Sequence, residues 1–212
     1  MIKIIPAINV QSFEEFKQRI ISLIDLTNYF HFDIAKESFC GYNSYDDVFD
    51  IERIGKDVKL DLHLMDYVLP LSLFNFNKSY IKRLIFHLKV SNPEGLIKVG
   101  RKIKKEIFFA IEPQEDPQIL RNYSNWIDGL LIMGVSPGRS GQKLDERSLD
   151  NLRKAKKDFK NLKIGFDGGV KKENFQEILK YKPDFIVIGS AIYSSQDPKS
   201  EYLYFKKISS MV

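Results

Sequence analysis

The sequence lacks several features that would place it in a specialised class of protein. Cys40 is the single cysteine among 212 residues, which excludes a disulfide-rich secreted scaffold. No stretch approaches the ~18 consecutive apolar residues of a transmembrane helix, so a membrane protein is excluded as well. The first residues, MIKIIPAINV, run at once into polar sequence and lack a cleavable signal pattern. We therefore expect a reduced, cytoplasmic protein with no membrane partner.

The sequence also lacks a large excess of either positive or negative charge. Lysine and arginine number 33 against 28 acids, giving a formal net charge of +5, and they are spread along the chain. The densest basic run, 153–160, has helical periodicity and is typical of a solvated helix face. No aromatic and basic module accompanies it, so we expect no nucleic-acid partner. A weak basic field still favours encounter with a phosphorylated metabolite.

Short apolar runs alternate with segments of helical spacing along the whole chain, and no linker or composition shift interrupts them. Runs rich in Ile, Val, Leu and Phe lie at about 2–9, 29–34, 58–65, 82–88, 106–112, 127–133, 162–167 and 184–189. Their lack of polar alternation is typical of parallel strands that are buried on both faces. Eight strands alternating with eight helical stretches predict a (β/α)8 TIM barrel that occupies residues 1–212 as a single domain. A doubly wound open sheet is the alternative, but no G-x-G-x-x-G follows the first strand.

Polar residues gather at the C-terminal ends of these strands, where the active sites of such barrels lie. His31 and Asp33 are two residues apart, so they project to the same side of a strand. His63 and Asp167 end two other strands. Two imidazoles and two carboxylates could converge on one divalent ion, and this mixed ligand set suits Zn, Fe, Mn or Co.

Two further polar residues lie near the same strand ends. Asp61 precedes His63 by two residues, and His87 ends the fourth strand. A lone buried histidine is more often a satisfied core residue than a ligand. His87 therefore belongs either to the core or behind the ligands.

Glycine segments follow the sixth, seventh and eighth strands. Gly168 and Gly169 come directly after Asp167, Gly189 follows the eighth strand, and the loop 138–141 follows the sixth. Bare backbone N–H groups at these places recur in the phosphate sites of barrels. Any one glycine pair could simply make a turn, but three segments at neighbouring strand ends favour a phosphate site.

These segments, in this order, resemble the ribulose-phosphate 3-epimerase family over nearly the whole chain. The matching motifs are HFD at 31–33, DLHLM at 61–65, FH at 86–87, LLIMGVSPGRSGQ at 130–142, FDGGV at 166–170 and VIGSAIY at 187–193. The resemblance implies a TIM barrel of the ribulose-phosphate-binding type and an isomerase that inverts carbon 3 of a ketose phosphate. The expected partner is a small-molecule sugar phosphate, in the first place D-ribulose 5-phosphate, which would become D-xylulose 5-phosphate.

The resemblance also implies roles for individual residues. Asp33 and Asp167 are expected to act as catalytic acid and base, and one divalent metal ion is expected on His31, Asp33, His63 and Asp167. Met65 and Met133 are expected to crowd the reacting carbons. Substrate and phosphate contacts are expected from His63, Gly138, Arg139, Ser140, Gly141, Gly168, Gly169, Gly189 and Ser190.

The chemistry of epimerisation explains why two carboxyl groups are needed. A carbon next to a ketone is inverted when a proton leaves one face and another arrives at the opposite face, by way of an enediolate. Two carboxyl groups on opposite walls can do this if one is ionised and the other protonated.

The sequence departs from the family in the expected sugar pocket, which we assign to Ala7, Ala35, Met65 and Met133. Ala7 stands where the family has a serine, and Ala35 where it has a methionine. Arg139 in the phosphate loop either adds affinity for phosphate or is a solvated cation. The expected metal ligands and both aspartates are present, but the expected pocket differs from that of the family. The alternative substrate is therefore another ketose phosphate, such as a tetrulose 4-phosphate or an allulose 6-phosphate.

Three other questions stay open at this point. A decarboxylase or aldolase would share the phosphate loops, but no lysine falls at a strand end to form a Schiff base. The lost serine and methionine also permit a non-catalytic barrel that binds a phosphorylated metabolite. The family often forms oligomers, so we expect a homo-oligomer, although the aromatic residues of 67–80 could equally pack inside the chain.

Overall fold

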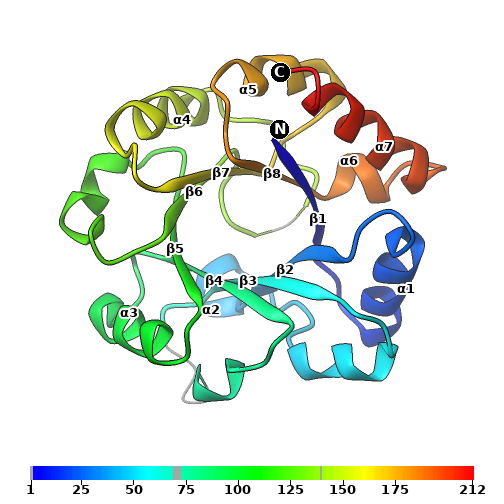
Figure 1. The fold of residues 1–212 in the computed structure, drawn as a ribbon, viewed down its shortest axis with the longest axis horizontal. Coiled ribbons are helices and arrows are strands. Elements are labelled where there is room, and N and C mark those ends of the chain that lie inside the picture. The colour runs from blue at the N-terminus through cyan, green and yellow to red at the C-terminus, as the bar shows by residue number, and fades with distance from the viewer. Residues whose placement is uncertain (1, 69–72, 139) are drawn as a thin grey trace.

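The computed structural model describes residues 2–68, 73–138 and 140–212. Eight parallel strands close into a barrel in chain order, and the last strand pairs with the first. Figure 1 shows the ring of strands end-on, with the helical segments outside it. The strands are β1 (Lys3–Ile8), β2 (Tyr29–Ala35), β3 (Lys59–Met65), β4 (Ile81–His87), β5 (Glu106–Ile111), β6 (Gly129–Met133), β7 (Lys163–Asp167) and β8 (Phe185–Ile188). The predicted TIM barrel is confirmed, and the open sheet is excluded.

The helical segments around the barrel are less regular than the sequence pattern predicts. Five α-helices have nine or more residues: α1 (Phe13–Leu23), α3 (Pro93–Lys102), α4 (Arg147–Asp158), α5 (Lys172–Lys180) and α7 (Pro198–Ser209). The shorter segments are α2 (Glu37–Cys40), α6 (Ser190–Tyr193) and the 3-10 helices η1 (Val48–Ile54), η2 (Leu73–Phe76) and η3 (Pro117–Tyr123). A helical segment therefore follows each strand, but those after β2, β3 and β5 are short α-helices or 3-10 helices. After β2, Gly41 and Gly55 adopt positive φ and end α2 and η1 early.

The apolar residues of the strands lie in two separate cores, one between the strands and the helices and one inside the barrel. On β3, Leu60, Leu62 and Leu64 face the helices and are buried. The alternate residues of the strands point into the barrel. Those from β1, β4, β5, β6 and β8 form an inner apolar cluster: Ile5, Ala7, Ile85, Phe108, Ala110, Leu131, Met133, Phe185 and Val187. The inward residues therefore stack in layers from the N-terminal base of the barrel to its C-terminal mouth.

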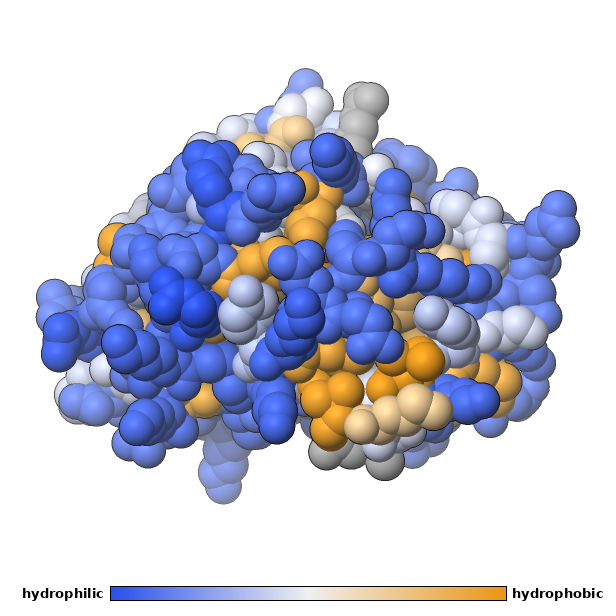
Figure 2. All heavy atoms as spheres, turned by 90° about the horizontal axis from the view of Figure 1, so that it is seen from above, coloured by the Kyte–Doolittle hydropathy of each residue, from blue (hydrophilic) through white to orange (hydrophobic). Residues whose placement is uncertain are grey.

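The face of the molecule shown in Figure 2 is mostly hydrophilic. The face on the side of α5 and the C-terminus carries mainly hydrophilic side chains, with hydrophobic ones gathered toward one edge (Figure 2). On α4, Arg153 and Lys154 form ion pairs with Asp150 and Asp116, which agrees with a solvated basic helix face. In the parts of the chain that the structure covers, no helix has the length and apolarity to cross a membrane.

Candidate metal centre and active site

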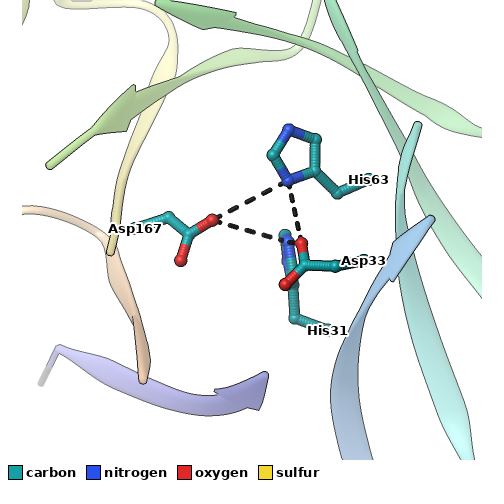
Figure 3. Close-up of side chains that lie close together, drawn as sticks. All are labelled: His31, Asp33, His63 and Asp167. Atoms are coloured by element: carbon teal, nitrogen blue, oxygen red, sulfur yellow. Dashed lines mark hydrogen bonds and ion pairs between the residues drawn. The ribbon is translucent and has the colours of Figure 1, made fainter. Parts of the chain in front are cut away.

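Four polar side chains meet at the mouth of the barrel, and we call them the mouth cluster: His31, Asp33, His63 and Asp167. In the strand register Asp33 lies beside His63, so β2 and β3 deliver neighbouring side chains to the barrel interior. Asp167 ends β7 and faces the other three from the opposite side (Figure 3). One ligand atom from each residue lies within 4.8 Å of all the others. The sequence prediction that these residues converge agrees with this geometry.

The distances within the mouth cluster suit one metal ion. His31 Nε2 lies 3.2 Å from Asp33 Oδ1 and 3.8 Å from Asp167 Oδ2. His63 Nδ1 lies 3.0 and 3.7 Å from the same two oxygens. A tetrahedral ion with bonds of about 2.1 Å holds its ligand atoms roughly 3.4 Å apart. The observed separations fall on both sides of that value.

Buried nitrogen atoms without a hydrogen-bond partner also fit a metal-binding role. His31 is fully buried, and neither of its ring nitrogens has a hydrogen-bond partner among the described residues. Such a group costs about 1–3 kcal/mol, and native structures rarely leave one without a reason. His31 Nε2 faces two carboxylates, so a divalent ion would satisfy the nitrogen and balance the charge. The residues present fit a metal of the predicted kind.

The two carboxyl groups of the mouth cluster differ in protonation. Burial alone would raise the pKa of Asp33, but its contacts with His31 and His63 outweigh burial and hold the pKa below its ordinary value. Burial raises the pKa of Asp167 to about 7, and the nearby charge of Asp33 adds to this effect. Near neutral pH, Asp33 is therefore ionised while a large share of Asp167 is protonated.

The structure separates the two further polar residues of the strand ends. His87 is buried directly behind the mouth cluster, with its Nε2 3.0 Å from His63 Nε2. Asp61 lies one inward layer deeper, where it accepts hydrogen bonds from Tyr29 and Arg83. Its grouping with the strand-end residues is therefore wrong, because two residues along a strand separate it from the layer of His63.

A cavity opens above the mouth cluster and is lined by Asp33, His63 and Asp167. Other residues expected to hold substrate or phosphate also line it: Gly138, Ser140, Gly141, Gly168, Gly169, Gly189 and Ser190. Arg139 lies outside the described residues, so the structure does not place it.

Three of the four expected pocket residues, Ala7, Met65 and Met133, line this cavity. Ala35 does not, which corrects the expectation for that residue. Its backbone N–H donates to Ser44 Oγ at 2.8 Å, and its carbonyl accepts from Ser44 N at 3.0 Å. The segment between these two residues folds back over Ala35 and leaves it fully buried.

Gly168 and Gly169 have a structural role that is separate from any ligand. Their φ angles are +94° and +68°, a region that residues with a Cβ rarely adopt. A Cβ on Gly169 would lie 2.8 Å from Leu144 Cα, so the turn after β7 also needs the space. This turn exposes backbone to the cavity beside Asp167.

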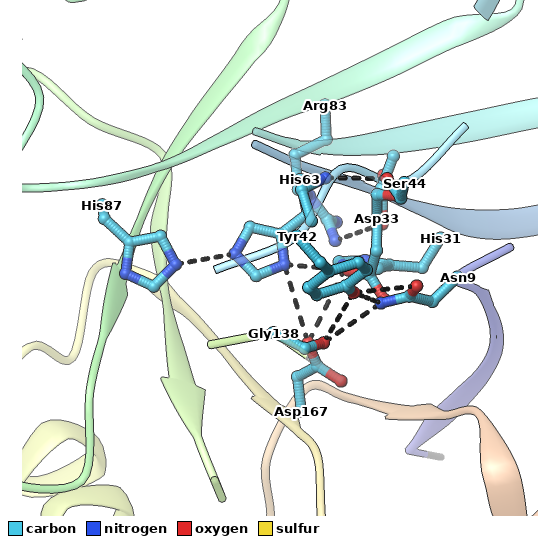
Figure 4. A network of polar contacts seen from close by, with 12 residues as sticks. Asn9, His31, Asp33, Tyr42, Ser44, His63, Arg83, His87, Gly138 and Asp167 are labelled. Atoms are coloured by element: carbon cyan, nitrogen blue, oxygen red, sulfur yellow. Dashed lines mark hydrogen bonds and ion pairs between the residues drawn. The ribbon is translucent and has the colours of Figure 1, made fainter. Parts of the chain in front are cut away.

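Sequence reasoning missed a polar bridge across the cavity rim. Asn9 Nδ2 donates to Tyr42 Oη at 2.8 Å and to the carbonyl of Gly138 at 3.1 Å (Figure 4). Tyr42 Oη lies 3.0 Å from the same carbonyl. The bridge joins the end of β1, the segment after α2 and the loop after β6. Neither residue belongs to a recognisable motif, and their proximity depends on loops whose paths spacing does not predict.

Comparison with known proteins gives one consistent family. A model described as the ribulose-phosphate 3 epimerase family matches residues 3–193. The ribulose-phosphate 3-epimerase of Mycoplasma genitalium is 31% identical over 144 residues, 66% of this chain and 67% of that protein. That of Buchnera aphidicola is 31% identical over 150 residues, 68% of this chain and 65% of that protein. The matched segments thus span about two thirds of these relatives.

Solved structures support the fold alone. A 3-hexulose-6-phosphate synthase from Salmonella typhimurium aligns with a TM-score of 0.71 at 15% identity, over 99% of this chain and 97% of that chain. The tryptophan synthase A-subunit from Pyrococcus furiosus aligns with a TM-score of 0.68 at 15% identity, over 98% and 95% of the two chains.

Proposed function

The chain belongs to the ribulose-phosphate 3-epimerase family of carbohydrate isomerases, and we propose that it inverts carbon 3 of a ketose phosphate. Because the relatives are named ribulose-phosphate 3-epimerases, the first substrate we propose is D-ribulose 5-phosphate, with D-xylulose 5-phosphate as product. The observation that carries the proposal is the pair of carboxyl groups, from β2 and β7, that lie on either side of His31. Their surroundings shift their pKa values in opposite directions, which supports the proposal.

The two aspartates perform the proton transfers. Asp33, held ionised by its histidine neighbours, removes the carbon-3 proton from one face of the substrate. Asp167, whose pKa is about 7, delivers a proton to the opposite face of the enediolate. In the reverse direction the two residues exchange roles. Carboxyl groups whose environments separate their pKa values are suited to this division of work.

Four side chains, His31, Asp33, His63 and Asp167, would hold one divalent ion of Zn, Fe, Mn or Co. When bound, the ion supplies Lewis-acid stabilisation of the negative charge that develops on the substrate oxygens. His63 also lines the cavity, so the same residue borders ion and substrate. Met65 and Met133 present apolar surface there and help to exclude water.

The phosphate is assigned to the glycine-rich side of the cavity. Gly138, Ser140 and Gly141 come from the loop after β6. Gly168 and Gly169 follow β7, and Gly189 and Ser190 follow β8. Glycine has no side chain to shield its backbone N–H group, so several such groups together can donate hydrogen bonds to an anion. The phosphate lies far from the reacting carbon, so its binding energy serves to position that carbon between the two aspartates.

The identity of the sugar is the open part of the proposal. Ala7 lines the cavity and offers no hydroxyl group to the substrate. A tetrulose 4-phosphate or an allulose 6-phosphate is therefore the alternative substrate. Turnover measured across ketose phosphates of four to six carbons decides between them, and a clear preference for D-ribulose 5-phosphate would refute the alternatives.

The direct test follows the carbon-3 hydrogen in deuterated water. With the metal-loaded enzyme, we expect D-ribulose 5-phosphate to gain deuterium at carbon 3 while D-xylulose 5-phosphate forms. A protein that bound the ion and the sugar phosphate without exchange on any ketose phosphate would be the non-catalytic barrel, and the proposal would fail.

A further inference from the structure

A buried chain of side chains runs from the mouth cluster to the outer end of β5. His63 Nε2 lies 3.0 Å from His87 Nε2, and His87 Nδ1 lies 3.6 Å from Glu112 Oε1. Figure 4 shows His87 behind His63, on the side away from Asp33. His63, His87 and Glu112 are at most 5% exposed, so their contacts with one another lie inside the protein. The proton transfers proposed above use neither His87 nor Glu112.

The position of the proton on His63 decides whether this residue can bind a metal. A neutral imidazole carries one proton, and the nitrogen that carries it has no lone pair for an ion. His63 must coordinate through Nδ1, because that nitrogen faces Asp33 and Asp167. Its Nδ1 lies only 3.0 Å from Asp33 Oδ1, and this carboxylate favours a proton on the wrong nitrogen.

His87 provides the opposing preference. If His87 carries its proton on Nδ1, its bare Nε2 accepts a hydrogen bond from His63 Nε2–H and leaves His63 Nδ1 free. Glu112 favours that arrangement electrostatically, because its carboxylate lies 3.6 Å from His87 Nδ1, a nitrogen that has no hydrogen-bond partner among the described residues. The two histidines carry two protons in either arrangement, so the change is a paired tautomeric shift without net protonation.

We propose that His87 and Glu112 are positioning residues that select the metal-binding tautomer of His63. Glu112 is itself fixed, since Lys89 donates to its Oε1 at 2.6 Å and Gln114 donates to its Oε2. Metal-ligating histidines commonly depend on such an outer partner, whose loss lowers metal affinity about 10- to 100-fold. The inference rests on the proposed metal site and adds two residues that do not line the cavity.

The first experiment titrates Co²⁺ into metal-free protein and follows the visible absorption of the bound ion. His87→Phe keeps a ring at the position that stacks on His63 at 5.2 Å but removes the acceptor. We expect its Co²⁺ affinity to fall about 10- to 100-fold. His87→Gln restores an acceptor and should recover most of the loss, which a purely structural role would not predict.

A second pair of variants supplies a matched control on one strand. Glu106 begins β5 and Glu112 follows its last residue, so the same Glu→Gln change can be made at both ends of the barrel. Glu112→Gln should weaken Co²⁺ binding by about tenfold, whereas Glu106→Gln should leave it unchanged. Thermal unfolding of the metal-free variants checks that each is folded before the titration.

Nitrogen NMR of the Zn²⁺-loaded wild type tests the tautomers directly, and the chain has only three histidines to assign. We expect the proton of His63 on Nε2 and that of His87 on Nδ1. A proton on His87 Nε2, or a Co²⁺ affinity in both His87→Phe and Glu112→Gln equal to that of the wild type, would overturn the inference. Failure of the wild type to bind Co²⁺ would instead refute the proposed metal site.

Discussion

The two ends of this barrel both bury charged side chains, but they satisfy them in different ways. At the N-terminal end lies a base cluster of Tyr29, Asp61, Arg83, Glu106 and Lys163. Tyr29 and Arg83 donate to the two oxygens of Asp61 at 2.6 and 2.9 Å. Arg83 and Lys163 both pair with Glu106, and the Arg83 guanidinium lies 4.2 Å from the ring centres of Phe108 and Phe185.

The mouth cluster has no such internal balance. Within the described residues, the buried side-chain atoms without a hydrogen-bond partner are both ring nitrogens of His31 and Nδ1 of His87, all at the mouth. Two carboxyl groups share this space, and the described residues of the cavity lining include no lysine or arginine. The buried groups of the base need no further partner and lose stability when one of them is removed, whereas the incompletely paired groups of the mouth can take a ligand. The comparison assigns stability to the base and ligand binding to the mouth.

The largest expected effect is on catalysis at the mouth. Asp33→Asn and Asp167→Asn each remove one proton-transfer group, so the rate of carbon-3 exchange should fall by about three orders of magnitude. The measurement is deuterium incorporation into the substrate. Glu106→Gln at the base is the control and should keep the wild-type rate per folded molecule. Exchange at a normal rate in either aspartate variant would remove the two-carboxyl mechanism.

The next effect is on stability at the base. Arg83→Met leaves Asp61 buried without its cation, and we expect the free energy of unfolding to fall by about 3–5 kcal/mol. Urea denaturation of the metal-free protein measures the change, and Co²⁺ affinity of the folded variant should stay at the wild-type level. A loss below about 1 kcal/mol would mean that the base cluster does not stabilise the fold as the comparison states.

A smaller effect of opposite sign is expected for Asp167→Asn. The folded-state pKa of Asp167, about 7, lies above its ordinary value of 3.8, so the folded state favours the neutral acid. The stability contributed by that group is complete below pH 3.8 and is lost as the pH rises through about 7. Asparagine carries no charge, so the metal-free variant should be more stable than the wild type at pH 8, by up to about 4 kcal/mol.

That stabilisation should disappear at pH 4, where Asp167 is neutral in the folded wild type. Urea denaturation with chelator at both pH values provides the measurement. The depressed pKa of Asp33 gives stability that is lost as pH falls, but it is present in both proteins and largely cancels. A variant that is less stable than the wild type at pH 8 would show that Asp167 is a structural group and would break the comparison.

The smallest expected effect concerns the wall of the mouth. Ala7→Ser returns a hydroxyl group to the cavity, and one new hydrogen bond of about 1 kcal/mol should lower KM by less than about tenfold. Ala35→Ser places the same group away from the cavity and should lower stability without changing KM. Steady-state kinetics with the best ketose phosphate separates the two. An equal change of KM in both variants would contradict the assignment of the cavity wall.

The sequence was sufficient to predict the parts of this molecule that depend on periodicity. Strand positions follow from apolar runs, and the inward direction of His31, Asp33 and His63 follows from their spacing of two along strands. Closure of the sheet brings β7 opposite β2, and so Asp167 reaches the same point. These features repeat a simple geometric rule and need no knowledge of loop conformation.

The remaining features depend on contacts between distant segments. Ala35 was expected in the pocket, but a return of the chain through Ser44 covers it. Asp61 is a carboxylate on the same strand as His63, so the sequence does not distinguish it from a site residue. It lies one layer deeper in the barrel, where it pairs with Arg83. Two further contacts join segments that are distant in the sequence, so no local pattern predicts them. One is the bridge from Asn9 to Tyr42 and Gly138. The other is the contact between His87 and Glu112.

The alternation of inward and outward residues makes the mouth intolerant of shifts in strand register. Shifting the register of β2 by one residue would turn His31 and Asp33 toward the helices and bring Phe32 into the barrel interior. New specificity can therefore arise through point substitutions on the wall or through altered loops, while the strands themselves must keep their frame.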